Sequence, residues 1–310
     1  MIQIMADIAH GAGETEGAGQ LVSVLVTVYN RERWLGEALE SILASSGQDF
    51  EIIIVDDGST DGSVRVARGF ADGNERIRVY ENDTNLGDYA NRNRAASYAR
   101  GRYLKYVDAD DVIYSHALGF MAEAMERHPN AALGLSHSAP EEVEPYPFAL
   151  RPSEAYQKHF LRQGCLNCGP SGAIILREAF ESLGGFNPEW GVLGDAELWL
   201  RLAARSPVVL LPPGLVWWRR HPGQEYSSGD ADLRYLRDGF RLAMSVLREP
   251  GCPLTTEEAI RARKKHRQHY ARRLWSLALR QKKPGAALRL ARDSGLSLVE
   301  VAEGLAPYRK

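Results

Sequence analysis

The segment LVSVLVTVYN, residues Leu21–Asn30, decides the fold class. Its apolar side chains are nearly continuous instead of alternating with polar ones, which is typical of a parallel strand covered on both faces. The next segment, ERWLGEALESILAS (32–45), has apolar residues at helical spacing. A buried strand followed directly by an amphipathic helix is the repeating unit of a doubly wound α/β fold.

The same unit recurs along the first 130 residues. Further strands are predicted at FEIIIVDD (50–57), IRVYEN (77–82) and YLKYVDADD (103–111), and further helices at SVRVARGFA (63–71), YANRNRAASYARG (89–101) and HALGFMAEAMERHP (116–129). This alternation predicts a Rossmann-like, mostly parallel sheet flanked by helices.

The rest of the chain predicts a different organisation. Residues 1–20 are rich in Gly, Ala and Glu and are expected to form a disordered leader. One domain is predicted over 21–229, with halves at 21–130 and 131–229. The Arg-rich residues 230–310 repeat apolar side chains at helical spacing, so we expect a helical C-terminal extension packed on that domain.

Composition limits the class of protein. The chain has 310 residues, of which 44% are hydrophobic, and a net charge of -2. The near-neutral net charge argues against nucleic acid as a partner. Three cysteines are too few for a disulfide framework, and no apolar run has the length of a transmembrane helix. A cytoplasmic location is the expectation.

Polar side chains gather where the predicted strands end. Thr27 and Tyr29 end the first strand, Asp56 and Asp57 the second, and the acids of DADD (108–111) the fourth. Open α/β sheets bind ligands at the carboxyl ends of their strands. Neighbouring carboxylates repel one another unless a cation holds them. Since neither G-x-G-x-x-G nor a P-loop lysine is present, a divalent metal gripping a diphosphate is favoured.

Several segments occur together in a recognisable order: VSVLVTVYNRERWLGEALESIL, FEIIIVDDGSTDGS, NLGDYANRNRAASYARGRYLKYVDADD, GDAELWLRLA and RRHPGQEYS. In this order they resemble a family 2 inverting glycosyltransferase with the GT-A fold. The resemblance covers roughly Leu21 to Ser228. No family motif is recognised after Asp230.

The resemblance implies a set of nucleotide contacts. Thr27, Tyr29 and Asp57 would hold the base, and Asp108 would reach the ribose. Arg92 would contact the diphosphate or ribose together with Asn93; a solvated helix face is the alternative. A tyrosine ring can stack on a base, and a carboxylate can accept the N–H of uracil or thymine. UDP- and dTDP-sugars are therefore favoured, with guanine left open.

The resemblance also implies a metal site. DADD corresponds to the family's DxD motif, with Asp110 as metal ligand and Asp111 as a rival for that role. His221 would complete the metal's coordination once the nucleotide is bound. Oxygen ligands suit Mn²⁺ or Mg²⁺, and imidazole suits Mn²⁺ better than Mg²⁺.

Asp195, in LGDAELW, is the predicted catalytic base. Many family members have Glu-Asp at the head of this helix, whereas this chain has Gly194 before the Asp. Glu197 is the competing assignment. Asp195 is preferred because a side chain in the first turn of a helix can point into a cleft; helix capping is its alternative role.

The predicted reaction moves a hexosyl or related sugar from a nucleotide diphosphate sugar to an acceptor hydroxyl, with inversion. The acceptor would be a carbohydrate or a lipid-linked molecule in polysaccharide, glycolipid or glycoconjugate synthesis. The alternatives are a nucleotidyltransferase and a non-catalytic nucleotide-sugar or carbohydrate-binding module. The basic segment RARKKHRQHYARR (261–273) predicts peripheral contact with the inner face of a membrane, or else a solvated helix face.

Overall fold

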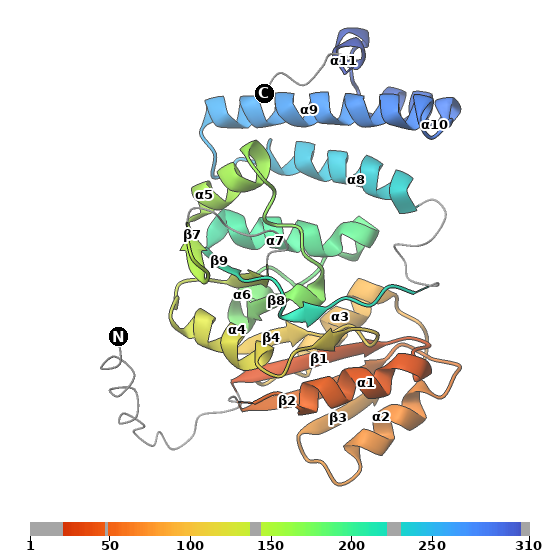
Figure 1. Ribbon diagram of the computed structural model, residues 1–310, viewed down its shortest axis with the longest axis vertical. Coiled ribbons are helices and arrows are strands. Elements are labelled where there is room, and N and C mark those ends of the chain that lie inside the picture. The colour runs from red at the N-terminus through yellow and green to blue at the C-terminus, as the bar shows by residue number, and fades with distance from the viewer. Residues whose placement is uncertain (1–20, 47–48, 137–143, 222–230, 305–310) are drawn as a thin grey trace.

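The computed structural model describes residues 21–46, 49–136, 144–221 and 231–304. The predicted leader at 1–20 lies outside these ranges. Within them, the main sheet has eight strands in the order β3-β2-β1-β4-β8-β6-β9-β7. Helices cover both faces of it (Figure 1). The predicted α/β class with a Rossmann-like sheet is confirmed.

The first half alternates strands and helices as the periodicity predicts. Its elements are β1 (Val22–Val28), α1 (Glu32–Leu43), β2 (Phe50–Asp56), α2 (Ser63–Ala71), β3 (Ile77–Glu81), α3 (Asp88–Ser97) and β4 (Tyr103–Tyr106). All of these strand pairs are parallel. Neighbouring residues of β1 enter different cores, because Val24 and Val26 pack with α1 while Leu25 packs with α3. Burial on both faces explains the continuous apolar run.

The second half mixes strand directions. Its elements are β5 (Val112–Ile113), α4 (Ala117–Glu126), β6 (Leu133–Ser136), β7 (Phe148–Leu150), α5 (Pro152–Tyr156), η2 (Gln157–Leu161), η3 (Pro170–Gly172), β8 (Ala173–Leu176), α6 (Arg177–Ser182), η4 (Pro188–Leu193), α7 (Gly194–Arg205), β9 (Val208–Leu211) and β10 (Val216–Trp217). Strand β8 runs antiparallel to β4 and β6, and β7 runs antiparallel to β9. The sheet is therefore mixed.

The predicted fourth strand, 103–111, is too long. Strand β4 ends at Tyr106, the acids form a turn, and β5 starts at Val112. Strand β5 pairs with β10 in a separate two-stranded sheet. This small sheet matters for the site, because it carries the residues after Trp217 toward the acidic turn.

The C-terminal extension is helical. It contains α8 (Ala231–Val246), α9 (Thr256–Leu279), α10 (Pro284–Asp293) and α11 (Leu298–Glu303). Thr255 and Glu258 form a reciprocal capping box at the start of α9. Figure 1 shows α9 above α8, and α8 above α7. Side chains of α8 share one core with α7, among them Leu242 and Leu247, so the extension is packed on the sheet domain.

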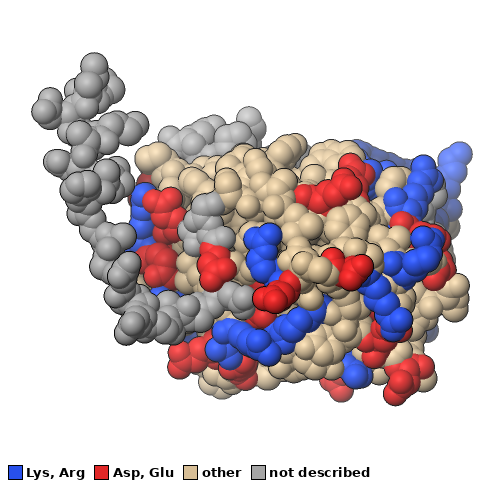
Figure 2. Space-filling view, turned by 90° about the horizontal axis from the view of Figure 1, so that it is seen from below, with Lys and Arg blue, Asp and Glu red and all other residues tan. Residues whose placement is uncertain are grey.

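Within the part of the chain that the structure describes, neither the charge on one end of the molecule nor the helices show a feature typical of nucleic-acid binding or of a membrane span. On the end of the molecule formed by the first half, basic and acidic side chains alternate over the described residues and form no field of one sign (Figure 2). Over the described ranges, none of the helices combines the length and apolarity needed to cross a bilayer.

Candidate active site

A cavity of about 1080 Å³ opens at the carboxyl ends of β1, β2 and β4. Seven of the predicted site residues line it: Thr27, Tyr29, Asp57, Arg92, Asp108, Asp110 and Asp195. The eighth, His221, reaches the cavity through its contact with Asp110. A second cavity of about 920 Å³, among α8, α9 and α10, contains none of them. The structure thus brings the predicted residues together.

Asp56 and Asp57 have different roles at the end of β2. Asp56 Oδ1 accepts from the Ser59 amide at 2.8 Å, which is an ordinary turn contact. Asp57 is buried, and its Oδ1 accepts from the Leu86 amide at 2.9 Å while its Oδ2 accepts from the Gly87 amide at 2.9 Å. Asp57 therefore fixes the loop before α3, and its Oδ2 can still accept a second hydrogen bond.

Arg92 is buried, so its interpretation as part of a solvated helix face is wrong. Its Nη2 donates to Asp108 Oδ1 at 2.8 Å, and its Nε lies 2.9 Å from Asp88 Oδ1. Burial alone would lower the pKa of Arg92, but Asp108 and Asp88 raise it well above the usual value. Nη1 is buried without a hydrogen-bond partner among the described residues, which suits an anionic ligand in the cavity.

Asn93 does not accompany Arg92 into the cavity. Its Nδ2 donates to the Phe186 carbonyl at 2.8 Å, and its Oδ1 accepts from the Phe186 amide at 2.9 Å. These two bonds fasten α3 to the loop before η4. Of the expected Arg-Asn pair, Arg92 therefore lines the cavity, and Asn93 holds α3 against the loop before η4.

A buried lysine lies under the acidic turn. Lys105 Nζ donates to the Tyr106 carbonyl at 2.9 Å and to the Ser171 carbonyl. Burial lowers the pKa of Lys105 to about 8, and the nearby Cys168, Asp108 and Asp111 oppose that shift. Sequence reasoning missed Lys105, because a lysine in the middle of a strand gives no sign that its ammonium lies beneath two carboxylates.

Asp111 braces the turn and is less suited than Asp110 to reach a ligand. It is only 2% exposed, and its Oδ1 accepts from the Arg219 amide at 3.1 Å. Burial raises the pKa of Asp111, and the neighbouring charge of Asp108 adds to the effect. Asp111 therefore links the turn to the loop after β10, and it lines the cavity beside Asp110.

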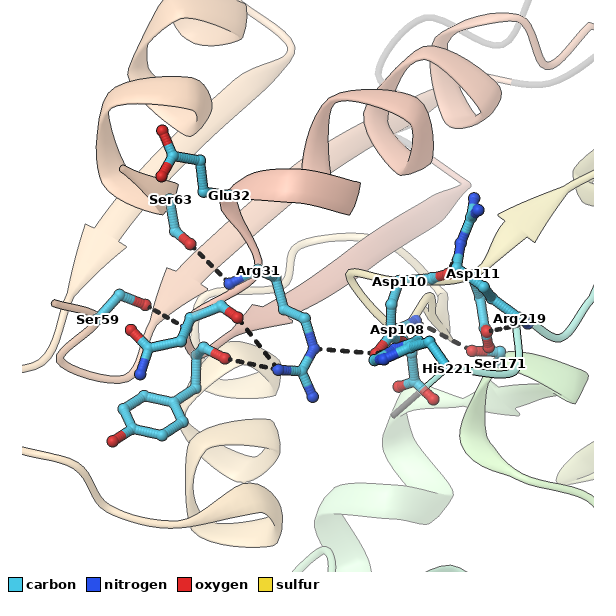
Figure 3. Close-up of polar contacts among 12 residues, drawn as sticks. Arg31, Glu32, Ser59, Ser63, Asp108, Asp110, Asp111, Ser171, Arg219 and His221 are labelled. Atoms are coloured by element: carbon cyan, nitrogen blue, oxygen red, sulfur yellow. Dashed lines mark hydrogen bonds and ion pairs between the residues drawn. The ribbon is translucent and has the colours of Figure 1, made fainter. Parts of the chain in front are cut away.

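Asp110 and His221 meet although they are far apart in the sequence (Figure 3). His221 Nε2 donates to Asp110 Oδ2 at 2.9 Å. The pairing of β10 with β5 positions the histidine, and its ring lies 5.5 Å from the ring of Trp34. Arg31 Nε donates to the same oxygen, also at 2.9 Å. Sequence reasoning missed Arg31, which carries no motif of its own.

The donor set fits a divalent metal that arrives with a ligand. Within the described ranges, no group of three or more His, Cys, Asp or Glu side chains is placed to hold a metal ion. Asp110 and His221 supply one oxygen and one nitrogen. Mg²⁺ and Mn²⁺ in nucleotide sites commonly take few protein ligands and complete their shells with phosphate oxygens and water.

Asp195 faces the cavity from the first turn of α7. Its Oδ1 accepts from the Ala196 amide at 2.6 Å. Burial raises the pKa of Asp195 to about 6; the Ala196 amide and Arg92 oppose this rise, and Asp88 and Asp108 add to it. A carboxylate with this pKa is ionised at neutral pH and is a better proton acceptor than an ordinary aspartate.

Glu197 is committed to a different contact. Its Oε1 lies 2.7 Å from Arg201 Nε, and its Oε2 accepts from Arg201 Nη2 at 2.8 Å. Arg201 also donates to the carbonyls of Leu183 and Gly185. Glu197 therefore stabilises the loop before η4 and does not line the cavity.

Packing explains why Gly194 precedes Asp195. A Cβ at position 194 would lie 2.7 Å from Cδ2 and Cε2 of Tyr89, closer than carbon atoms approach. Tyr89, from α3, lines the cavity and fills the space that a glutamate at position 194 would need. The departure from the Glu-Asp pattern therefore leaves Asp195 in place.

The helical extension also contributes to the cavity wall. Tyr235 of α8 lines the cavity, and Arg241 of the same helix stacks on Trp190 at 5.2 Å from the ring centroid. The sequence gives no signal for this contact, because the chain after Asp230 carries no recognised motif. The extension is thus part of the site as well as of the core.

Comparison with known proteins is consistent with this geometry. Residues 23–184 match the sequence profile of Glycosyl transferase family 2. The putative glycosyltransferase EpsE of Bacillus subtilis is 32% identical over 189 residues, 59% of this chain and 67% of that protein. Of two further curated relatives, the chain covers only 39% and 38%.

Solved structures share the fold. Staphylococcus aureus TarS 1-349, in complex with UDP-GlcNAc, is 18% identical with a TM-score of 0.67, covering 88% of this chain and 80% of that one. The mannosyltransferase PcManGT from Pyrobaculum calidifontis, in complex with GDP-Man and Mn²⁺, is 20% identical with a TM-score of 0.61, covering 93% and 81%. From its sequence profile and its fold, the chain belongs to glycosyl transferase family 2 and is a glycosyltransferase of the GT-A type.

Proposed function

We propose that the chain transfers a sugar from a nucleotide diphosphate sugar to an acceptor hydroxyl, with inversion and with the help of a divalent metal. One observation carries the proposal: the Asp110–His221 pair and the Asp195 carboxylate, whose pKa is raised, border one cavity. The pair suits a metal-bound diphosphate, and the carboxylate suits the deprotonation of a hydroxyl.

The chain's own residues account for donor binding. Tyr29 is 47% exposed at the cavity edge, where its ring can stack on the base. Asp57 Oδ2 can accept an N–H from uracil or thymine. Nη1 of Arg92 is free to donate to the diphosphate or ribose. The solved structures with the same fold support a nucleotide-sugar donor, since TarS was solved in complex with UDP-GlcNAc and PcManGT in complex with GDP-Man.

Asp195 accounts for the reaction. Its Oδ2 takes the proton of the acceptor hydroxyl while the hydroxyl oxygen bonds to the anomeric carbon, and the bond from that carbon to the diphosphate oxygen breaks. Oδ1 stays bonded to the Ala196 amide, which holds the carboxylate in position. Asp110 and His221 would hold Mn²⁺ or Mg²⁺, which when bound neutralises charge on the departing diphosphate.

We expect nucleoside diphosphate release to identify the donor. The full chain is incubated with UDP-, dTDP- and GDP-sugars and Mn²⁺, with and without excess chelator. We expect release from a uracil or thymine donor that stops in chelator, together with a rise in melting temperature on binding. Formation of the nucleoside triphosphate and sugar 1-phosphate when pyrophosphate is added would instead indicate nucleotidyl transfer. Binding without release from any donor would indicate a non-catalytic module.

We also propose that the acceptor is a carbohydrate or a lipid-linked molecule, which α9 would help to reach at a membrane surface. Arg263 and Lys265 donate to the carbonyls of Leu247 and Leu161, so part of the basic segment holds the extension in place. Arg261, Lys264 and Arg273 are exposed and remain available for lipid headgroups.

We expect the chain to float with anionic vesicles more than with neutral ones in a flotation assay. Each basic residue near an anionic surface contributes about 1 kcal/mol. Replacing Arg261 and Lys264 with Glu should reduce the difference. Equal flotation of the unmodified chain with both vesicle types would rule out the membrane contact and leave a solvated helix face.

A further inference from the structure

Arg31 is held firmly on both its main chain and its side chain. Its amide donates to Ser63 Oγ at 2.8 Å, which fixes the turn after β1 against α2. Its Nη1 donates at 3.1 Å to the carbonyls of Tyr29 and Asn30. The guanidinium then extends from the end of β1 to the acidic turn, where Nε reaches Asp110 (Figure 3).

Each acid of the turn has a partner of its own. Arg92 pairs with Asp108, Arg31 pairs with Asp110, and Asp111 accepts from the Arg219 amide. The Arg31–Asp110 pair is sheltered, with 28% and 11% of the two side chains exposed. Its attraction is therefore stronger than that of an open surface pair.

The pair occupies the oxygen that a metal would need. Asp110 Oδ2 accepts both Arg31 Nε and His221 Nε2 at 2.9 Å. A divalent cation bound to that oxygen would lie beside the guanidinium, and the two positive charges would repel. His221 has no such conflict, since an imidazole can turn its lone pair to a metal.

We propose that Arg31 is the resident counter-ion of Asp110, and that it leaves this carboxylate when a metal–nucleotide complex binds. The inference rests on the proposed donor function. No covalent bond changes; one positive charge moves from Asp110 toward the diphosphate, in the cavity that Arg31 already lines. Arg31 thereby opposes binding of the metal alone and supports binding of the metal with its nucleotide, because only the nucleotide offers the guanidinium a new anion.

The test is a titration of Mn²⁺ into the nucleotide-free full chain, followed by the electron paramagnetic resonance signal of the free ion. We expect Arg31→Gln to bind Mn²⁺ about tenfold more tightly than the unmodified chain, because the competing charge is gone. Adding UDP should tighten Mn²⁺ binding less in Arg31→Gln than in the unmodified chain. Arg31→Met is a second neutral variant in case Gln disturbs the turn.

Two variants serve as matched controls. Arg31→Lys keeps the charge and should bind Mn²⁺ like the unmodified chain. Arg33→Gln removes a charge two residues away, from an exposed side chain that stacks on Trp34 and does not touch Asp110, and should also leave binding unchanged. Adding Asp110→Asn to Arg31→Gln should abolish the gain in affinity.

The outcomes separate this inference from the function on which it rests. If the unmodified chain binds Mn²⁺ and both neutral variants bind it no more tightly, Arg31 is a structural brace and the exchange is refuted, while the metal site stands. A gain that survives Asp110→Asn also refutes the exchange. If neither the unmodified chain nor Arg31→Gln binds Mn²⁺, with or without UDP, the proposed metal site fails and the exchange fails with it.

Discussion

Replacing Asp195 with Asn should lower the turnover of sugar transfer by about 10²- to 10⁴-fold, the usual contribution of a general base. Asn keeps the size of the side chain and can still accept from the Ala196 amide, but it cannot take the proton of the acceptor hydroxyl. The affinity for UDP and Mn²⁺ should stay unchanged, so the loss appears in kcat. Steady-state kinetics and calorimetry with one authentic donor and acceptor check both statements.

Glu197→Gln is the matched control for this prediction. It makes the same chemical change two residues away, but it disturbs the ion pair with Arg201 and not the cavity. We expect lower stability and nearly normal turnover. An active Asp195→Asn protein beside an inactive Glu197→Gln protein would reverse the assignment of the base.

The pH dependence gives Asp195 a second signature. Because its pKa is raised to about 6, kcat/KM should rise with pH through about 6 and level off above it. The folded state binds this proton more tightly than the unfolded state, so ionisation lowers the free energy of unfolding by about 2–3 kcal/mol above pH 6. Asp195→Asn should therefore melt several degrees higher at pH 8, and the gain should vanish near pH 4.

Replacing Asp110 with Asn should weaken metal-dependent UDP binding by about 100-fold. Loss of an outer-shell partner alone costs 10- to 100-fold in metal affinity, and Asp110 is the proposed direct ligand. Calorimetry should show that the variant binds UDP equally with Mn²⁺ and with chelator. His221→Ala should have a smaller effect, because the carboxylate remains.

Asp111→Asn distinguishes the two adjacent acids. Asp111 is buried against the Arg219 amide, so we expect a change in stability with metal-dependent binding retained. Full UDP affinity of the unmodified chain in excess chelator would contradict the metal site. Loss of metal dependence in Asp111→Asn alone would transfer the ligand role to that residue.

The fold could be predicted from the sequence where local pattern and burial agree. The continuous apolar run of β1 reflects its burial on both faces, and the turns after β1 and β2 follow from where those runs stop. The turn after β4 was predicted as strand, because its acids continue directly from an apolar run. Strand direction in the second half could not be predicted, because β8 and β6 are short and their pairing depends on distant partners. The domain boundaries at 130 and 229 stay predictions.

The acidic residues of the site could be predicted from the sequence, whereas its basic residues were predicted less well. Motif order singled out Asp108, Asp110 and Asp195, and the structure places all three on one cavity. Arg31 and Lys105 were missed, because their importance comes from where their charged ends lie and not from the residues beside them. For Arg92 the sequence left a ligand contact and a solvated helix face open, because its burial follows from packing that a helical pattern does not reveal.

The contact between Gly194 and Tyr89 constrains how this site can change over generations. A side chain at position 194 collides with the aromatic ring as long as Tyr89 remains, so acquiring a glutamate there requires a smaller residue at position 89 first. The reverse order passes through an overpacked intermediate. We therefore expect substitutions at position 89 on α3 and position 194 on α7 to occur together in evolution. The residue at position 89 must become smaller before the residue at position 194 can become larger.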